Sequence, residues 1–144
     1  NRVLQISGDL GSDSFPESPQ AFARNITVRG VGFTDIHFAA HGFQANFNMW
    51  DDSEGIPHDA ALRISGATRV MVDKCRFENL AGAGVAITNG SSEVIVSDSN
   101  FRSLGQSAVM LIGNATIQPR WCLITGNVIE HVGVILYSAG GVYA

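Results

Sequence analysis

The densest group of chemically reactive side chains lies in residues 38–59, FAAHGFQANFNMWDDSEGIPHD. This stretch combines acids and histidines with aromatic rings: His41, Asp51, Asp52, Glu54, His58 and Asp59, beside Phe43, Phe47 and Trp50. An aromatic ring can pack on the C–H face of a sugar while carboxylates accept hydrogen bonds from its hydroxyl groups. The stretch therefore indicates sugar binding. It is equally compatible with a solvated turn in which Asp and Ser cap backbone groups.

Two reactions suit these residue types. Glycoside hydrolysis needs one protonated carboxyl group as acid and a second carboxylate as base or nucleophile. Asp51 and Asp52 could raise each other's pKa, because close like charges disfavour ionisation. A polysaccharide lyase instead needs a base for the sugar's C5 proton and a cation for the developing enolate. Arg63, with His58 or Asp59, could supply that pair.

The candidate catalytic residues are therefore Asp51, Asp52, Glu54, His58 and Asp59, and the candidate substrate-binding residues are Gln5, His41, Trp50, Arg63 and Tyr143. We expect no cofactor and no metal centre. Calcium held by Asp51, Asp52 and Glu54 is the alternative that carboxylate chemistry allows, but no recognised loop spacing supports it.

An internal repeat predicts the elements that must position these residues. Four segments align without gaps: ITVRGVGFTDI from Ile26, VMVDKCRFENL from Val70, VIVSDSNFRSL from Val94 and CLITGNVIEHV from Cys122. A further short strand precedes each of them, or follows the last: LQIS, LRIS, VAIT, VMLI and GVYA. Three short strands per repeat predict an all-β, three-sided parallel solenoid of about four coils.

Charges support this register. Parallel stacking places equivalent residues about 4.8 Å apart, so outward charges at equivalent positions should alternate in sign. They do so in five contacts: Arg29–Asp73, Arg69–Glu93, Lys74–Asp98, Glu78–Arg102 and Arg102–Glu130. An antiparallel sandwich would explain the alternating strands but not this matching between coils. The same register places Cys75 and Cys122 about 10 Å apart, too far for a disulfide, and predicts two buried thiols.

Insertions interrupt the repeat at residues 9–23, 38–59 and 115–120, and all of them border the strands of the LQIS type. We therefore expect a groove on the outward face of that sheet. Its floor would consist of two columns: Gln5, Arg63, Ala86, Met110 and Tyr143, and then Ser7, Ser65, Thr88 and Ile112.

Composition narrows the classes of partner. The 144 residues have a formal net charge of −4, which disfavours a nucleic-acid backbone as partner. No apolar run reaches the roughly 20 residues of a membrane-spanning helix. Asn-x-Ser/Thr sequons at Asn25, Asn89 and Asn114 favour secretion. Because the chain starts at Asn1 and stops as a new coil begins, we expect a single-domain piece of a longer solenoid, inactive without its remaining coils.

The segments PHDAALRISGATRVMVDKCRFENLAGAGVAI, LGQSAVMLIGN, ITGNVIEHVG and SAGGVYA resemble right-handed β-helix repeat proteins of the pectin-lyase-like superfamily. The resemblance covers residues 25–144, and the chain is similar to secreted β-helix glycoside hydrolases and polysaccharide lyases. It implies a right-handed helix that binds polysaccharide in the groove. Since the superfamily also contains tailspikes and adhesins, two hypotheses stay open: a carbohydrate-cleaving enzyme, or a non-catalytic carbohydrate-binding, adhesin or structural module.

Overall fold

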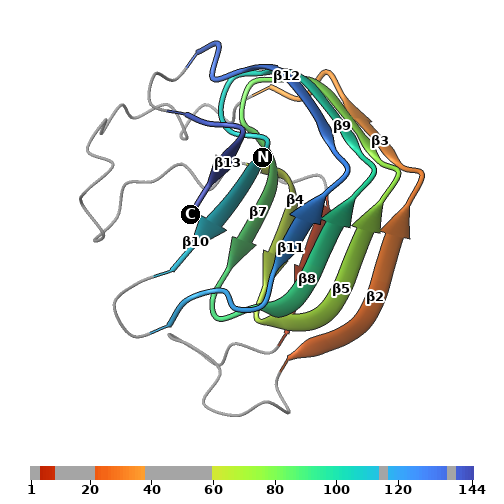
Figure 1. Ribbon diagram of the computed structural model, residues 1–144, viewed down its shortest axis with the longest axis vertical. Helices are drawn as coiled ribbons and strands as arrows, with labels where there is room; N and C mark the ends of the chain where they lie inside the picture. The colour runs from red at the N-terminus through yellow and green to blue at the C-terminus, as the bar shows by residue number, and fades with distance from the viewer. Residues whose placement is uncertain (1–3, 9–21, 38–59, 114–116, 136–138) are drawn as a thin grey trace.

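The computed structural model describes residues 4–8, 22–37, 60–113, 117–135 and 139–144 (Figure 1). Within these residues every regular element is a short β-strand. The described part of the chain contains no helix long and apolar enough to cross a membrane.

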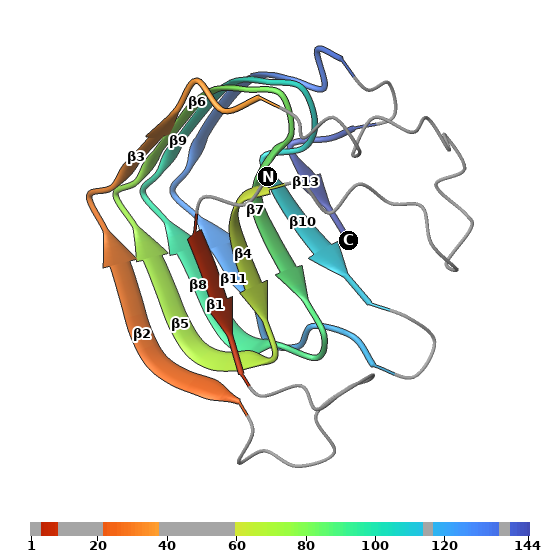
Figure 2. The same ribbon diagram turned by 180° about the vertical axis from the view of Figure 1, so that it is seen from behind.

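The strands form three parallel sheets, each of which takes one strand from every coil (Figures 1 and 2). Sheet A contains β1 (Leu4–Ser7), β4 (Ala60–Ser65), β7 (Ala83–Thr88), β10 (Val109–Ile112) and β13 (Val142–Tyr143). Sheet B contains β2 (Ala23–Arg29), β5 (Ala67–Asp73), β8 (Ser92–Ser97) and β11 (Leu123–Thr125). Sheet C contains β3 (Gly32–Thr34), β6 (Arg76–Leu80), β9 (Asn100–Leu104) and β12 (Val128–Val132). The chain visits A, B and C in turn, which confirms the three-sided solenoid.

The register between coils is the one that the repeat predicts. Ile26 pairs with Val70, and Val70 pairs with Val94. In sheet C, Phe77 lies between Phe33 and Phe101. Because equivalent residues are direct neighbours, each inward column of apolar side chains becomes a continuous row of the core.

Left-handed backbone conformations recur at the same place in each coil and bend the chain. At the corner between sheets B and C, Gly30, Lys74, Asp98 and Gly126 all have φ between 48° and 66°. Two further columns of positive φ follow sheets B and C, within the strands except at Trp121 and Asp35, which lie just outside them: Asn25, Arg69, Glu93 and Trp121, and then Asp35, Asn79, Ser103 and His131. Non-glycine residues adopt this conformation at a cost of roughly 1–2 kcal/mol. The bend is therefore specified by the left-handed backbone conformation and not by small side chains, because Lys74, a large residue, adopts it as well.

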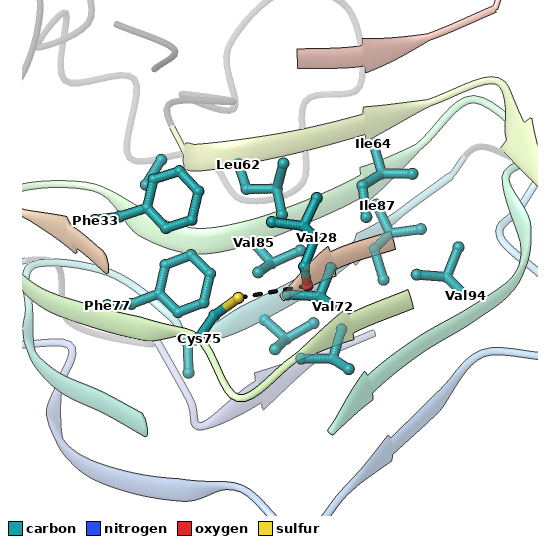
Figure 3. Packing of buried hydrophobic residues seen from close by; sticks show 14 of the residues in the cluster. Val28, Phe33, Leu62, Ile64, Val72, Cys75, Phe77, Val85, Ile87 and Val94 are labelled. Atoms are coloured by element: carbon teal, nitrogen blue, oxygen red, sulfur yellow. Dashed lines mark hydrogen bonds between the residues drawn. The ribbon is translucent and has the colours of Figure 1, made fainter. Parts of the chain in front are cut away.

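The core is a stack of side chains between the three sheets (Figure 3). The rings of Phe33 and Phe77 stack at 4.9 Å, and those of Phe77 and Phe101 stack at 4.7 Å with nearly parallel planes. Phe77 and Phe101 are fully buried. Inward residues of the last coil, such as Ile124 and Ile129, are only half-buried because β11 and β12 are edge strands.

The predicted charge contacts are correct in register but only partly formed as ion pairs. Arg29 Nε lies 3.0 Å from Asp73 Oδ2, and Arg102 Nε lies 3.8 Å from Glu130 Oε2. Glu78 is opposite Arg102, yet its ion pair is with Arg76, two residues earlier, at 3.7 Å.

The two remaining pairs of opposite charge, Arg69–Glu93 and Lys74–Asp98, show no ion pair within 4.0 Å in the described part of the chain. All four of these residues have positive φ. The register therefore determines which charges are opposite each other, but not which side chains form an ion pair. Of the five expected side-chain contacts, two are formed as ion pairs, and the expectation is wrong for Arg69–Glu93, Lys74–Asp98 and Glu78–Arg102.

A ladder of side-chain hydrogen bonds follows the corner between sheets B and C. The backbone N–H of Cys75 donates to Ser99 Oγ at 3.0 Å, and the N–H of Ser99 donates to Asn127 Oδ1 at 2.9 Å. Asn127 Nδ2 then donates to the carbonyl of Val96 at 2.8 Å. The third and fourth coils therefore each satisfy a buried N–H of the coil before them.

Both cysteines are free thiols, but only one is buried. Cys75 is 2% exposed and its thiol lies 3.5 Å from the carbonyl oxygen of Val28 (Figure 3). Cys122 precedes the edge strand β11 and is half-buried, so the prediction of two buried thiols is wrong for it. Partial burial raises the pKa of the Cys122 thiol, and a backbone hydrogen bond involving Val94 opposes that rise.

Phe77→Ala should lower the free energy of unfolding by about 3–5 kcal/mol, because it opens a cavity between two stacked rings. Phe77→Leu retains most of the volume and should cost less than half as much. Urea denaturation followed by circular dichroism measures both losses. A loss below about 1 kcal/mol for Phe77→Ala would contradict the ring stack.

Ser99→Ala should cost about 1–3 kcal/mol, because it leaves the buried N–H of Cys75 without an acceptor. Ser92→Ala is the matched control, since the Ser92 hydroxyl donates to the Thr68 hydroxyl in a partly buried position and not to a buried backbone group. The same denaturation experiment compares them, and equal losses would argue against the corner ladder.

Alkylation by iodoacetamide should distinguish the thiols. In the native protein Cys75 should stay unmodified, whereas Cys122 should react at a higher pH than an exposed cysteine does, because its raised pKa reduces the thiolate fraction at any given pH. Peptide mass spectrometry measures both rates, with the urea-unfolded protein as control. Equal native reactivity of the two cysteines would contradict this assignment.

Candidate functional site

Sheet A is the side of the solenoid where the connections vary. The corner between sheets B and C has the same length in every coil, at residues 30–31, 74–75, 98–99 and 126–127. The connections that enter or leave sheet A range from the single residue Gly66 to the whole of residues 35–59. Corners of constant length are what the repeated coil itself requires. The connections of variable length therefore mark the sheet A side as the place where this chain departs from a regular solenoid.

The two columns predicted for the outward face of sheet A are confirmed by the register. Gln5 pairs with Arg63, Arg63 with Ala86, Ala86 with Met110, and Met110 with Tyr143. The second column continues in the same way through Ser7, Ser65, Thr88 and Ile112.

The centre of this face is covered, so the expectation of an open groove floor is wrong there. Ala86 is 0% exposed and Met110 is 2% exposed. Together with Ala60 and Ala83 they form a second apolar cluster, against which Ile112 and Tyr143 pack. Strands buried on both faces read as nearly continuous apolar runs. Strand β7, AGVAIT, shows this signal, because polar residues do not alternate with apolar ones along it as they would in a strand with one exposed face.

Polar groups remain at the two ends of the first column. Gln5 on β1 is exposed, and its register neighbour Arg63 on β4 is half-buried. Tyr143, at the other end, is also half-buried. The sheet therefore presents an amide and a guanidinium on one side of the apolar cluster and a phenol on the other.

The second column is not free for a ligand at its centre. The side-chain amide of Asn89 donates to Ser65 Oγ at 2.8 Å, and the Thr88 hydroxyl lies 3.5 Å from the carbonyl oxygen of Ile64. Ser91 is buried, accepts a hydrogen bond from the N–H of Ala67 and donates to the carbonyl of Thr88. These groups brace the corner between sheets A and B, and two of them belong to the sequon at Asn89.

A residue that the sequence did not point to lies at the other border of sheet A. Gln106, between β9 and β10, is 9% exposed, and its Oε1 atom is buried and has no hydrogen-bond partner among the described residues. Its backbone is fully engaged, because its N–H donates to Gly82 and its carbonyl accepts from Gly133. A buried acceptor of this kind suits a water molecule or an incoming hydroxyl group. No pattern in the sequence distinguishes Gln106 from a solvent-exposed glutamine.

Most of the predicted site residues lie outside the described part of the chain: His41, Trp50, Asp51, Asp52, Glu54, His58 and Asp59. Of the ten candidates, the structure places Gln5, Arg63 and Tyr143. Two histidines outside the candidate set, His37 and His131, are exposed, His131 within sheet C and His37 shortly after β3.

Among the described residues no group of three His, Cys, Asp or Glu side chains could hold a metal ion. The calcium alternative rests on acids outside them.

Comparison with known proteins identifies the fold family. No curated protein and no solved structure matches the chain significantly. The family model described as "Right handed beta helix region" matches residues 20–144. This match agrees with three parallel sheets wound in repeated coils, and it adds the handedness that the sequence resemblance implied. The chain therefore belongs to the right-handed β-helix family.

Proposed function

We propose that this chain binds a polysaccharide on the sheet A side of the solenoid and cleaves it with acids from the connection 35–59. The observation that carries the proposal is the unequal length of the corners. Every connection between sheets B and C has the same length, whereas those around sheet A vary from one residue to a long insertion. Because the polymers concerned are extracellular, the proposal includes secretion.

The described residues supply binding groups of the right chemistry. Arg63 can donate paired hydrogen bonds to a carboxylate or to sugar hydroxyl groups. Tyr143 offers a ring for the C–H face of a sugar together with a hydroxyl group. Gln5 adds an exposed amide, and Gln106 adds a buried acceptor at the opposite border.

Catalysis must come from the connections. The strands of sheet A read LQIS, AALRIS, AGVAIT, VMLI and VY, and none of them contains a carboxylate. The acids proposed to act are therefore Asp51, Asp52 and Glu54, with His58 and Asp59 next to β4. A hydrolase would use two of the carboxyl groups. A lyase would combine His58 or Asp59 with the Arg63 cation.

The second candidate function is binding without cleavage. The absence of acids from the described strands of sheet A favours it, because the sheet itself would then supply only recognition. Trp50, His41, Arg63, Gln5 and Tyr143 would serve that role equally well.

Asp51→Asn and Asp52→Asn test the catalytic proposal. One of them should lower kcat by about 100-fold or more, because the proton transfer or nucleophile is lost. The melting temperature should stay within a few degrees of the parent. A polysaccharide panel monitored for reducing ends and for unsaturated products measures the rate and separates hydrolase from lyase. Binding without turnover by the parent protein would support the second candidate and contradict cleavage.

Arg63→Met tests the class of polymer. It removes the charge but keeps much of the side-chain volume, so affinity for a uronic polysaccharide should fall by about tenfold or more. Affinity for an uncharged polysaccharide should change much less. Isothermal titration with one polymer of each class measures the difference, and Arg76→Met on sheet C is the control. Unchanged affinity for every polymer that binds would exclude Arg63 from the site.

A further inference from the structure

Sheet B carries an apolar stripe on its outward face. The register aligns Thr27, Met71, Ile95 and Leu123 in one column across the four coils. Met71 is 39% exposed, Leu123 is 52% exposed and Ile95 is half-buried. This differs from sheet A, whose central outward apolar residues, Ala86 and Met110, are buried. A row of exposed apolar side chains on a folded surface is typical of an interaction site.

Two mainly polar columns flank the stripe. On one side lie Asn25, Arg69 and Glu93, followed by the exposed aromatic residue Trp121, and on the other lie Arg29, Asp73, Ser97 and Thr125. Asp73 is already engaged, because it forms the ion pair with Arg29 and accepts a hydrogen bond from Ser97 at 3.0 Å. Arg69 and Glu93 are exposed and form no ion pair within 4.0 Å in the described part of the chain. The unneutralised charges beside the stripe are therefore one of each sign, on adjacent coils.

This arrangement is complementary to itself. Consider two copies packed face to face through sheet B, related by a two-fold axis that runs parallel to the strands between β5 and β8. Arg69 then lies opposite Glu93 of the partner subunit, and Glu93 lies opposite Arg69 of the partner subunit. Met71 meets Ile95 of the partner subunit in the middle. The axis brings no like charges of these columns together.

We propose that sheet B is the interface of a homodimer with this two-fold axis. Face-to-face sheets with nearly aligned strands are an ordinary packing arrangement, and two-fold dimers are the commonest homo-oligomers. The proposal is independent of the polysaccharide site, because sheet A of each copy remains outside the interface.

A two-fold axis along the solenoid is less favourable. It would place Arg69 opposite Asp73 of the partner subunit, whose carboxylate is 7% exposed and already bound by Arg29 and Ser97. The exposed Glu93 would then lack a cationic partner. The first axis satisfies both exposed charges.

Sedimentation velocity over a series of protein concentrations tests the proposal. The parent chain should dimerise, and Arg69→Glu should raise the dimer dissociation constant by about tenfold or more, because it creates two like-charge contacts. The double variant Arg69→Glu/Glu93→Arg reverses both charges and should restore dimerisation to within about threefold of the parent. Met71→Asp, which would bury a charge at the centre, should also abolish the dimer.

Arg76→Glu on sheet C is the matched control and should leave dimerisation unchanged. Circular dichroism and melting temperature establish that each variant is folded, and Arg69→Gln replaces Arg69→Glu if the latter is not. A monomeric parent chain would overturn the proposal. So would a dimer that Arg69→Glu and Met71→Asp leave intact, or a double variant that fails to recover.

Discussion

Parallel hydrogen bonding between equivalent strands of successive coils is the interaction on which the whole structure depends. It brings residues that are one repeat apart in the chain into direct contact, as in the pairing of Phe77 with Phe101. Each inward position of the repeat then becomes a row of the core, and each outward position becomes a row of the surface. Stability in such a molecule is approximately a sum over neighbouring coils. The corner hydrogen bonds of Ser99 and Asn127 reinforce the same contact.

The fold could be read from the sequence because this register leaves a strong imprint on it. The Phe/Phe/Phe/Ile column and the four aligned segments predicted the sheet pairing correctly. The bends were less visible. Gly30 and Lys74 occupy the same corner position with the same left-handed backbone, but only glycine is recognisable in a sequence as a residue of that conformation. Alternating charges likewise predicted which residues are opposite each other. They did not predict which side chains meet, because Arg69 and Lys74 form no ion pair with the opposite charge on the next coil within the described residues.

The candidate site was predicted less completely. Gln5, Arg63 and Tyr143 lie in the expected column because strand register determines it. The prediction of an open floor between them was wrong, because Ala86 and Met110 belong to a buried apolar cluster on the outward face. Alternation of inward and outward residues alone does not reveal that an outward residue is buried. The burial of Gln106 is a local feature of the connection between β9 and β10, and no periodic pattern in the sequence predicts it. The acids of residues 38–59 remain a prediction, as they lie outside the described residues. The corners between sheets B and C have the same length in every coil, whereas the proposed chemistry belongs to the sheet A side, where the lengths of the connections vary.

A disulfide trap between coils tests the central claim most directly. The hydroxyl groups of Thr68 and Ser92, which are 24 residues apart, lie 3.0 Å apart on neighbouring strands. With Cys75 and Cys122 replaced by alanine, the pair Thr68→Cys/Ser92→Cys should oxidise readily in the native protein, because paired strands bring the two Cα atoms within disulfide reach. The shifted pair Thr68→Cys/Ile95→Cys should not. Failure of the first pair to oxidise, or equal oxidation of both, would contradict parallel stacking of the coils in this register.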